Sequence, residues 1–259
     1  MWPYLHLGPL ALRLPGLLWL VGLWLGLEAA SRQAARLRLS GEQLTNMVLW
    51  ALGGGVVAAR LGYALHYPQA FLQAPLSLFS LNPQTLEPTI GGLAALLVAV
   101  AYGQRHRLPL RPTLDALAPG ILVLAFFGAL ANASSGDAYG QPTTLPWGIE
   151  LWGARRHPTQ FYDALLTAAL LLWLWRATRQ PRGDGTGFLQ AVGGLAAVRL
   201  FTEAFRGDSL TLGGGVRVAQ VAAAAVLLAV VALYPYWRER GAPATPKGKG
   251  DARPRDRND

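Results

Sequence analysis

The chain has 259 residues, of which 52% are hydrophobic and only 14% are charged. A soluble domain carries about a quarter charged residues, so the composition argues against a soluble enzyme and against a disordered chain. The formal net charge is +9, but the basic residues form short clusters between apolar runs. Such clusters are typical of loops that face anionic lipid, and they argue against a nucleic-acid partner. The chain has no cysteine, which excludes disulfides and thiolate metal sites.

Seven apolar stretches approach the roughly 20 residues that a helix needs to cross a hydrocarbon core. The sequence therefore predicts an all-α fold, a polytopic membrane helix bundle of seven transmembrane helices over residues 1–237. A small periplasmic cap is expected from residues 67–87 and 132–159. The Pro- and Gly-rich basic segment 238–259 is predicted to be a disordered cytoplasmic tail. The seven stretches lie at residues 12–31, 44–66, 88–103, 113–131, 160–176, 187–205 and 216–237.

The distribution of basic residues predicts the orientation of the bundle. Basic clusters follow the first, third, fifth and seventh stretches, whereas residues 67–87, after the second, contain no Lys or Arg. Because basic loops stay in the cytoplasm, we expect the N-terminus outside and the C-terminus in the cytoplasm. The first stretch is also open to interpretation as a cleaved signal peptide, but the basic cluster after it and the poor cleavage site at 28–30 favour a retained helix.

Ionisable side chains inside the predicted spans are costly and therefore invite functional hypotheses. Arg60 in the second stretch either snorkels to the interface or faces the bundle interior and meets an anion. Arg199, Glu203 and Arg206 in the sixth stretch are spaced so that they share one helical stripe. They form either a structural ion pair or a cationic groove for phosphate, which a guanidinium binds through two parallel hydrogen bonds. Both alternatives remain open at this point.

The long loop between the fourth and fifth stretches is the other polar concentration. Its polar residues begin at Asn132, and it ends in the dense motif RHPTQFYD at 156–163. A loop of this length in a compact bundle is usually functional. The four histidines are scattered, so no metal site is predicted, and His157 is the one that lies in a dense polar motif.

Four ordered motifs resemble those of the bacterial prolipoprotein diacylglyceryl transferases, over about residues 13–237. The resemblance implies an enzyme of the bacterial inner membrane that needs no cofactor. It would move diacylglyceryl from phosphatidylglycerol to the cysteine thiol of a lipobox prolipoprotein signal peptide, releasing glycerol phosphate. The motifs are GGGVVAARLGYAL at 53–65, NASSGDAYGQPTTLPW at 132–147, RHPTQFYDALL at 156–166 and RLFTEAFRGD at 199–208.

The resemblance also implies roles for the arginines. Arg199 and Arg60 would bind the phosphate of the lipid, and Arg206 would assist at the outer mouth. Glu203 would orient Arg199. Arginines near a departing phosphate stabilise the transition state more than the ground state.

A base and a headgroup site complete the expected machinery. The substrate thiol must lose a proton, and His157, supported by Asp163, is the candidate base. The headgroup site would be shaped by Asn132, Asp137, Gly140, Gln160 and Tyr162.

Three positions depart from the family pattern. Ile90, Ala129 and Pro15 stand where the family usually has His, Arg and Tyr. An alternative interpretation is therefore a catalytically inactive relative that binds phospholipid or a lipoprotein precursor. A third is a transporter or another transferase on the same scaffold, because a fold does not fix a function.

Overall fold

Seven long helices form where the seven apolar stretches were predicted. The computed structural model describes residues 4–7, 10–79, 85–178 and 182–241. The last helix runs on to Gly241, past the predicted boundary at residue 237, and the rest of the predicted tail lies outside the described residues. The long helices are α1 (Leu14–Arg36), α2 (Gly41–His66), α4 (Pro88–Arg105), α5 (Leu110–Ser135), α6 (Thr159–Ala177), α7 (Thr186–Glu203) and α8 (Val218–Gly241).

Local signals explain where several helices begin and end. The Ser40 side chain caps α2 by accepting a hydrogen bond from the Gln43 N–H at 3.2 Å, as expected for an N-cap serine. A proline stands in the first turn of α1 and of α4, where its missing N–H leaves no helical bond unmade. Gly136, with a φ of 82°, ends α5 in the left-handed conformation.

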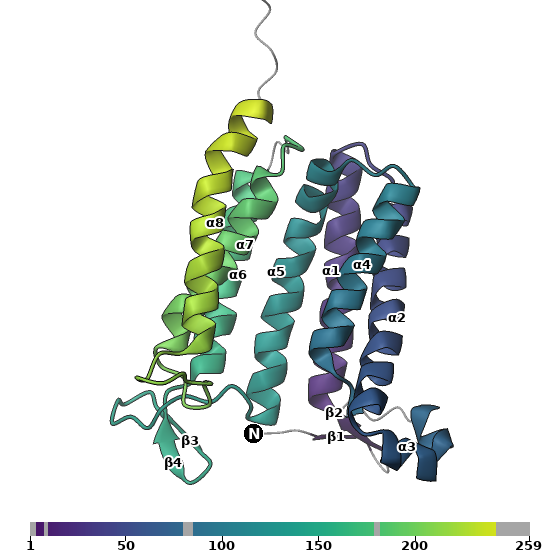
Figure 1. Cartoon of the computed structure of the whole chain (residues 1–259). Coiled ribbons are helices and arrows are strands. Elements are labelled where there is room, and N and C mark those ends of the chain that lie inside the picture. The colour runs from purple at the N-terminus through teal and green to yellow at the C-terminus, as the bar shows by residue number, and fades with distance from the viewer. Residues whose placement is uncertain (1–3, 8–9, 80–84, 179–181, 242–259) are drawn as a thin grey trace, which may run out of the picture.

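Short elements gather at one end of the bundle (Figure 1). They include two antiparallel hairpins, which the sequence analysis did not anticipate. Residues 67–79, 85–87 and 132–159 therefore lie at the same end of the molecule. The elements are β1 (Tyr4–Leu7) with β2 (Leu10–Arg13), α3 (Pro68–Gln73), the 3-10 helix η1 (Pro75–Phe79), and β3 (Ile149–Leu151) with β4 (Ala154–Arg156).

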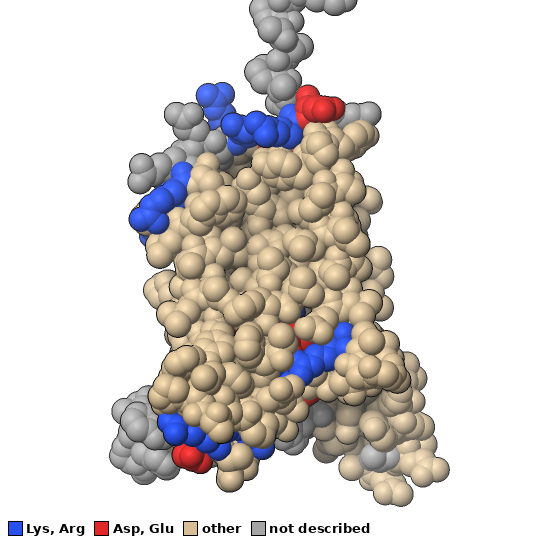
Figure 2. All heavy atoms as spheres, turned by 90° about the vertical axis from the view of Figure 1, so that its left-hand side faces the viewer, with Lys and Arg blue, Asp and Glu red and all other residues tan. Residues whose placement is uncertain are grey.

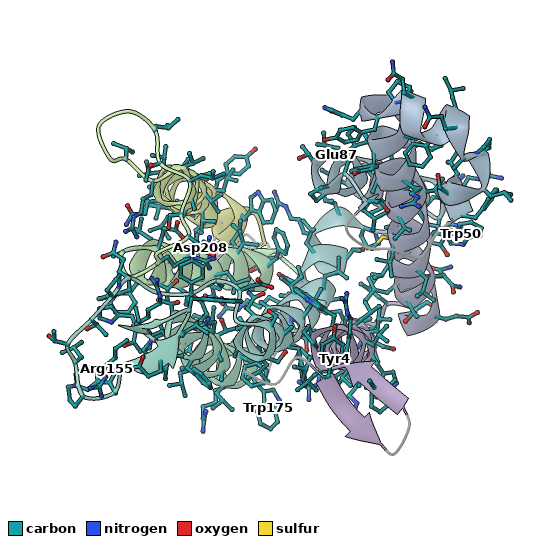
Figure 3. The ribbon with its side chains drawn as sticks, turned by 90° about the horizontal axis from the view of Figure 1, so that it is seen from below. Tyr4, Trp50, Glu87, Arg155, Trp175 and Asp208 are labelled. Atoms are coloured by element: carbon teal, nitrogen blue, oxygen red, sulfur yellow. The ribbon has the colours of Figure 1, made fainter. Side chains whose placement is uncertain are left out.

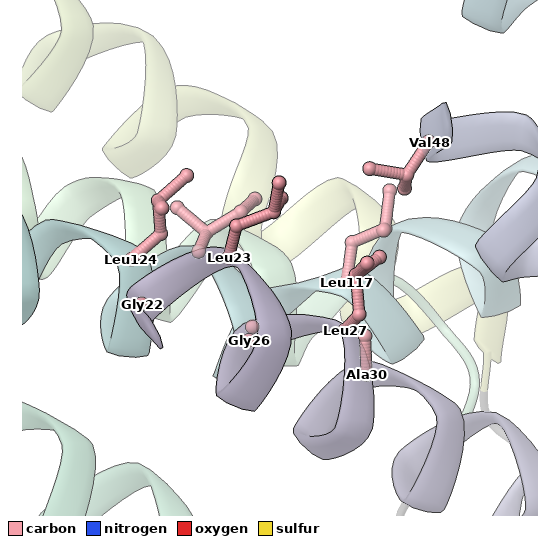
Figure 4. Close-up of a pocket in the computed structure, with 10 residues that line it drawn as sticks. Gly22, Leu23, Gly26, Leu27, Ala30, Val48, Leu117 and Leu124 are labelled. Carbon is pink, nitrogen blue, oxygen red and sulfur yellow. The ribbon is translucent and has the colours of Figure 1, made fainter. Parts of the chain in front are cut away.

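Helix α5 is the centre of the bundle. It packs against α1 on one side and against α6 and α7 on the other, while α2 packs on α4 and α8 packs on α7. The α1–α5 contact is close because Gly26 faces Gly120, where a Cβ on Gly26 would lie only 2.9 Å from the Gly120 carbonyl oxygen. Small residues permit such approaches between membrane helices. Beside this contact lies an apolar cavity of about 240 Å³ (Figure 4).

The outer surface of the bundle is largely apolar. Four helices, α1, α2, α5 and α8, are long and apolar enough to cross a membrane. Figure 2 shows one face on which an uncharged belt separates charged residues at the two ends, with acidic and basic atoms visible at one opening within the belt. The fold is therefore mostly helical and suited to a bilayer.

Candidate functional site

A pocket of about 290 Å³ lies between α1, α5, α6 and α7. Its residues come from the turns of these helices nearest the hairpin end. It combines a cation, a carboxylate, an amide and a hydroxyl with apolar walls, which is unusual within an apolar belt. The lining residues are Trp19, Ala125, Gly128, Ala129, Asn132, Asp163, Thr167, Leu195, Val198 and Arg199.

Arg199 is the cation of this pocket. Its Nη2 lies 2.9 Å from Oε2 of Glu203, one helical turn on, and its side chain is 40% exposed while that of Glu203 is 1% exposed. A buried carboxylate needs charged partners, and Glu203 has a second one in Arg206, whose Nε lies 3.7 Å away. The predicted ion pair is confirmed, and Arg199 also faces the pocket, so the two interpretations of this stripe are compatible.

Arg206 connects the end of α7 to the neighbouring elements. Its Nε donates a hydrogen bond of 3.0 Å to Oδ1 of Asp208, and its Nη2 donates one of 3.0 Å to Oδ2. Its Nη1 lies 4.0 Å from Oδ2 of Asp163, which lines the pocket from α6. Its backbone forms an isolated β-bridge with Gly140. Arg206 therefore holds the pocket wall and the long loop together, and it is not itself among the lining residues.

The start of α6 anchors the long loop from within. Gln160 and Thr159 are fully buried. Gln160 Nε2 donates to the Asp137 carbonyl at 2.8 Å, and Thr159 Oγ1 donates to the Ala138 carbonyl at 2.6 Å. Gly140 passes so close to the His157 carbonyl that a Cβ there would collide with it. The motif at 156–163 thus fixes the path of the loop beside the pocket.

The predicted base lies outside the pocket lining. His157 Nδ1 is 3.5 Å from the Tyr162 hydroxyl, which accepts a hydrogen bond of 2.9 Å from Trp147 Nε1. The His157 ring also packs against Phe205, with ring centroids 5.2 Å apart. The Asp137 side chain is exposed and accepts a hydrogen bond from Ser135 Oγ at 2.7 Å. Among the predicted site residues, the pocket brings together Arg199, Asn132 and Asp163.

Arg60 is placed in a different part of the bundle. It is buried, and its Nε and Nη1 donate 2.9 Å hydrogen bonds to the carbonyls of Leu78 and Thr85, with further bonds to the Ser77 carbonyl and the Thr85 hydroxyl. Arg60 therefore binds η1 and Thr85 from within the bundle and does not snorkel. Seen from below, the α2–α4 group that carries the labelled Glu87 is separate from the group that carries Asp208 (Figure 3). The structure does not bring Arg60 into the pocket of Arg199.

The three family departures fall in different places, and Pro15 stands in the first turn of α1. Ala129 lines the pocket and offers it only a methyl group. Ile90 packs instead against Gly62 of α2. Trp19, whose ring packs on Gly128 across the α1–α5 contact, was missed, because nothing local in the sequence couples two residues on different helices.

Comparison with known proteins agrees with these motifs. A family model described as prolipoprotein diacylglyceryl transferase matches residues 3–236. Relatives named phosphatidylglycerol–prolipoprotein diacylglyceryl transferase include one from Nitratidesulfovibrio vulgaris (strain DP4), 32% identical over 80% of this chain and 81% of its own. One from Rhizobium meliloti (strain 1021) is 33% identical over 80% of this chain and 83% of its own. One from Synechococcus elongatus is 29% identical over 96% of this chain and 92% of its own. The chain belongs to the prolipoprotein diacylglyceryl transferase family.

Proposed function

We propose that this chain transfers the diacylglyceryl group of phosphatidylglycerol to the cysteine thiol of a prolipoprotein lipobox. Phosphatidylglycerol and prolipoprotein are the substrates in the names of its relatives. The observation that carries the proposal is Arg199, a part-exposed guanidinium held by buried Glu203 at the wall of a polar pocket. Such a site suits a phosphate ester inside an apolar bundle.

The chemistry needs one bond formed and one broken. The thiolate sulfur attacks the glycerol carbon that bears the phosphate ester, so an S–C bond forms and the C–O bond to phosphate breaks. The electron pair leaves with glycerol phosphate, and Arg199 stabilises the negative charge that grows there. Glu203 is shared between Arg199 and Arg206, and Arg206 is also paired with Asp208. Glu203 therefore fixes the Arg199 guanidinium, which stays part-exposed at the pocket.

The thiol proton needs an acceptor, since a cysteine thiol has an ordinary pKa of about 8.5. We assign this role to His157, and Asp163 in the pocket wall is the competing acceptor. Asn132 also lines the pocket, and its amide is suited to donate to a headgroup oxygen. The long loop would shape the mouth of the pocket through Asp137, Gly140, Gln160, Tyr162 and Arg206. Arg60 would hold the other part of the cap, at η1 and Thr85.

The apolar cavity supplies a place for an acyl chain. Trp19 lines the polar pocket, and one turn on, Gly22 and Leu23 line the apolar cavity. On α5, the consecutive residues Leu124 and Ala125 line the apolar cavity and the polar pocket respectively. A lipid with its phosphate beside Arg199 would therefore find apolar surface one or two turns away along the same two helices (Figure 4).

All seven long helices are proposed to span the inner membrane. Beyond the four most apolar helices, α4 and α6 also expose large apolar side chains, such as Leu97 at 69% and Leu165 at 70%. The alternation of basic clusters supports an N-terminus outside and a C-terminus in the cytoplasm. The hairpin end would then be the periplasmic cap.

Direct transfer tests the proposal. Purified protein is mixed with labelled phosphatidylglycerol and a lipobox peptide, and both peptide lipidation and glycerol phosphate release are followed. Arg199→Ala is expected to lower the rate by about 10²–10³-fold. The matched control is Arg32→Ala, which breaks an exposed ion pair of the same i, i+4 spacing, Arg32 with Glu28. Equal rates in the two variants would refute the role of Arg199.

An inactive relative that binds phospholipid or a lipoprotein precursor is the second candidate. The observation in its favour is Ala129, which lines the pocket without any cationic group. Wild-type protein that binds phosphatidylglycerol without transfer, and that gains transfer on Ala129→Arg, would establish this alternative. Transfer by the wild-type protein would exclude it.

A further inference from the structure

A second polar cavity, of about 270 Å³, lies at the end of the bundle opposite the hairpins. Its walls come from the last turns of α1, α6 and α8 and the first turns of α5 and α7, which meet at that end (Figure 1). The residues that matter to the argument are Gln33, Asp115, Arg182, Gln190, Tyr234 and Arg238. The proposed transfer reaction uses none of them.

Three of these residues carry hydrogen-bond donors without a partner among the described residues. Arg182 and Arg238 form no ion pair within the described part of the chain. Gln33 is 6% exposed, and its side chain makes no hydrogen bond to any described residue. Gln33 lines the cavity, so its amide is open to a ligand there. Gln190 Nε2 donates to the Tyr234 hydroxyl at 3.1 Å, which leaves the phenolic hydrogen available to a ligand.

The carboxylate in this cavity is already engaged. Asp115 accepts hydrogen bonds from the Gly185 and Phe188 N–H groups at 2.8 and 2.9 Å. These groups belong to the start of α7, where the helix dipole compensates a negative charge. Asp115 therefore does not need the two arginines as counter-ions, although it limits the net positive charge of the cavity. An oxyanion with several acceptor oxygens is the ligand that matches the remaining donors.

We propose that this cavity binds the phosphate of an anionic phospholipid from the leaflet at that end of the bundle. Two guanidiniums and a primary amide suit the oxygens of a phosphodiester. The cavity lies at the ends of the long helices, and with these helices across a bilayer it would sit at the level of the headgroups. Trp237, which packs under Arg111 with 5.2 Å from the guanidinium carbon to the ring centroid, is a residue type enriched at that level. Free phosphate shares the chemistry but lacks the acyl chains.

Native mass spectrometry of the full chain in detergent counts the bound lipids. The probe is dioleoylphosphatidic acid, and the comparisons are dioleoylglycerol, which lacks phosphate, and inorganic phosphate. All variants carry Arg199→Gln, so that lipid at the candidate active site does not contribute. Because transfer is not the readout, failure of the proposed function leaves this test intact.

Arg182→Gln and Arg238→Gln are each expected to weaken binding of the probe by about tenfold, the loss of one charge-assisted hydrogen bond. The control is Arg176→Gln, an exposed arginine in the last turn of α6 at the same end, which should leave binding unchanged. Equal binding by the protein that carries both Arg182→Gln and Arg238→Gln and by the Arg176→Gln control would overturn the proposal. Equal binding of dioleoylglycerol, or full competition by inorganic phosphate at the same concentration, would also overturn it.

Gln33→Leu separates a ligand-binding role from a structural one. Removing the amide should weaken binding of the probe several-fold and leave the melting temperature of the lipid-free protein unchanged. A lower melting temperature with unchanged binding would show that Gln33 only supports the fold, and would contradict the proposed site.

Discussion

Replacing Glu203 with glutamine removes the negative charge that holds two arginines together. The carboxylate is buried, with Arg199 at 2.9 Å and Arg206 at 3.7 Å. Breaking a buried ion pair by removing one partner costs about 3–5 kcal/mol. The cost should be smaller here, because Arg206 keeps both of its hydrogen bonds to Asp208 and Arg199 reaches the pocket. We therefore expect a loss of about 1–3 kcal/mol in the free energy of unfolding.

The same change should also slow transfer. Without Glu203 the Arg199 guanidinium loses the partner that fixes it, so the rate is expected to fall by about tenfold or more while the protein remains folded. Denaturant unfolding in detergent and the transfer assay measure the two effects on one preparation. Glu28→Gln is the control, because the Glu28–Arg32 pair is exposed and should contribute less than about 1 kcal/mol. If Glu203→Gln and Glu28→Gln behave alike in both assays, the role given to Glu203 is refuted.

Two further predictions concern backbone contacts. Gly140→Ala puts a methyl group into the His157 carbonyl and should cost about 1–3 kcal/mol, seen as a lower melting temperature and slower transfer; unchanged values would mean that the loop has another path. Asp115→Asn weakens the two hydrogen bonds that cap α7 and should lower the free energy of unfolding by about 0.5–2 kcal/mol. Amide hydrogen exchange at the start of α7 should become faster in this variant and stay unchanged in the control Asp208→Asn. Equal exchange in the two variants would contradict the capping role.

The helices were predictable because their signals are local. A run of apolar residues long enough for a bilayer is visible in any window of the sequence. The two hairpins were missed because each strand is only three or four residues long, too short for a periodic pattern to indicate a strand. Their pairing depends on neighbours in the fold.

The site was predictable only where it lies on one element. The Arg199–Glu203 pair follows from the i, i+4 spacing. Which helices face each other does not follow from spacing, so the sequence could not show that Arg60 lies in the α2–α4 group and is bonded to the carbonyls of Leu78 and Thr85. For the same reason the packing of Trp19 on Gly128 could not be seen in advance.

The positions of the polar cavities also bear on the transporter alternative. Helix α5 contributes Asn132 to one polar cavity and Asp115 to the other, at opposite ends of the bundle. Between them, its buried side chains include Ala118 and Leu122, and the cavity along its contact with α1 is apolar. A transport path needs polar groups through the middle of the bundle, and the described residues of α5 provide none there. The arrangement favours a reaction confined to one end, with lipid entering from the side.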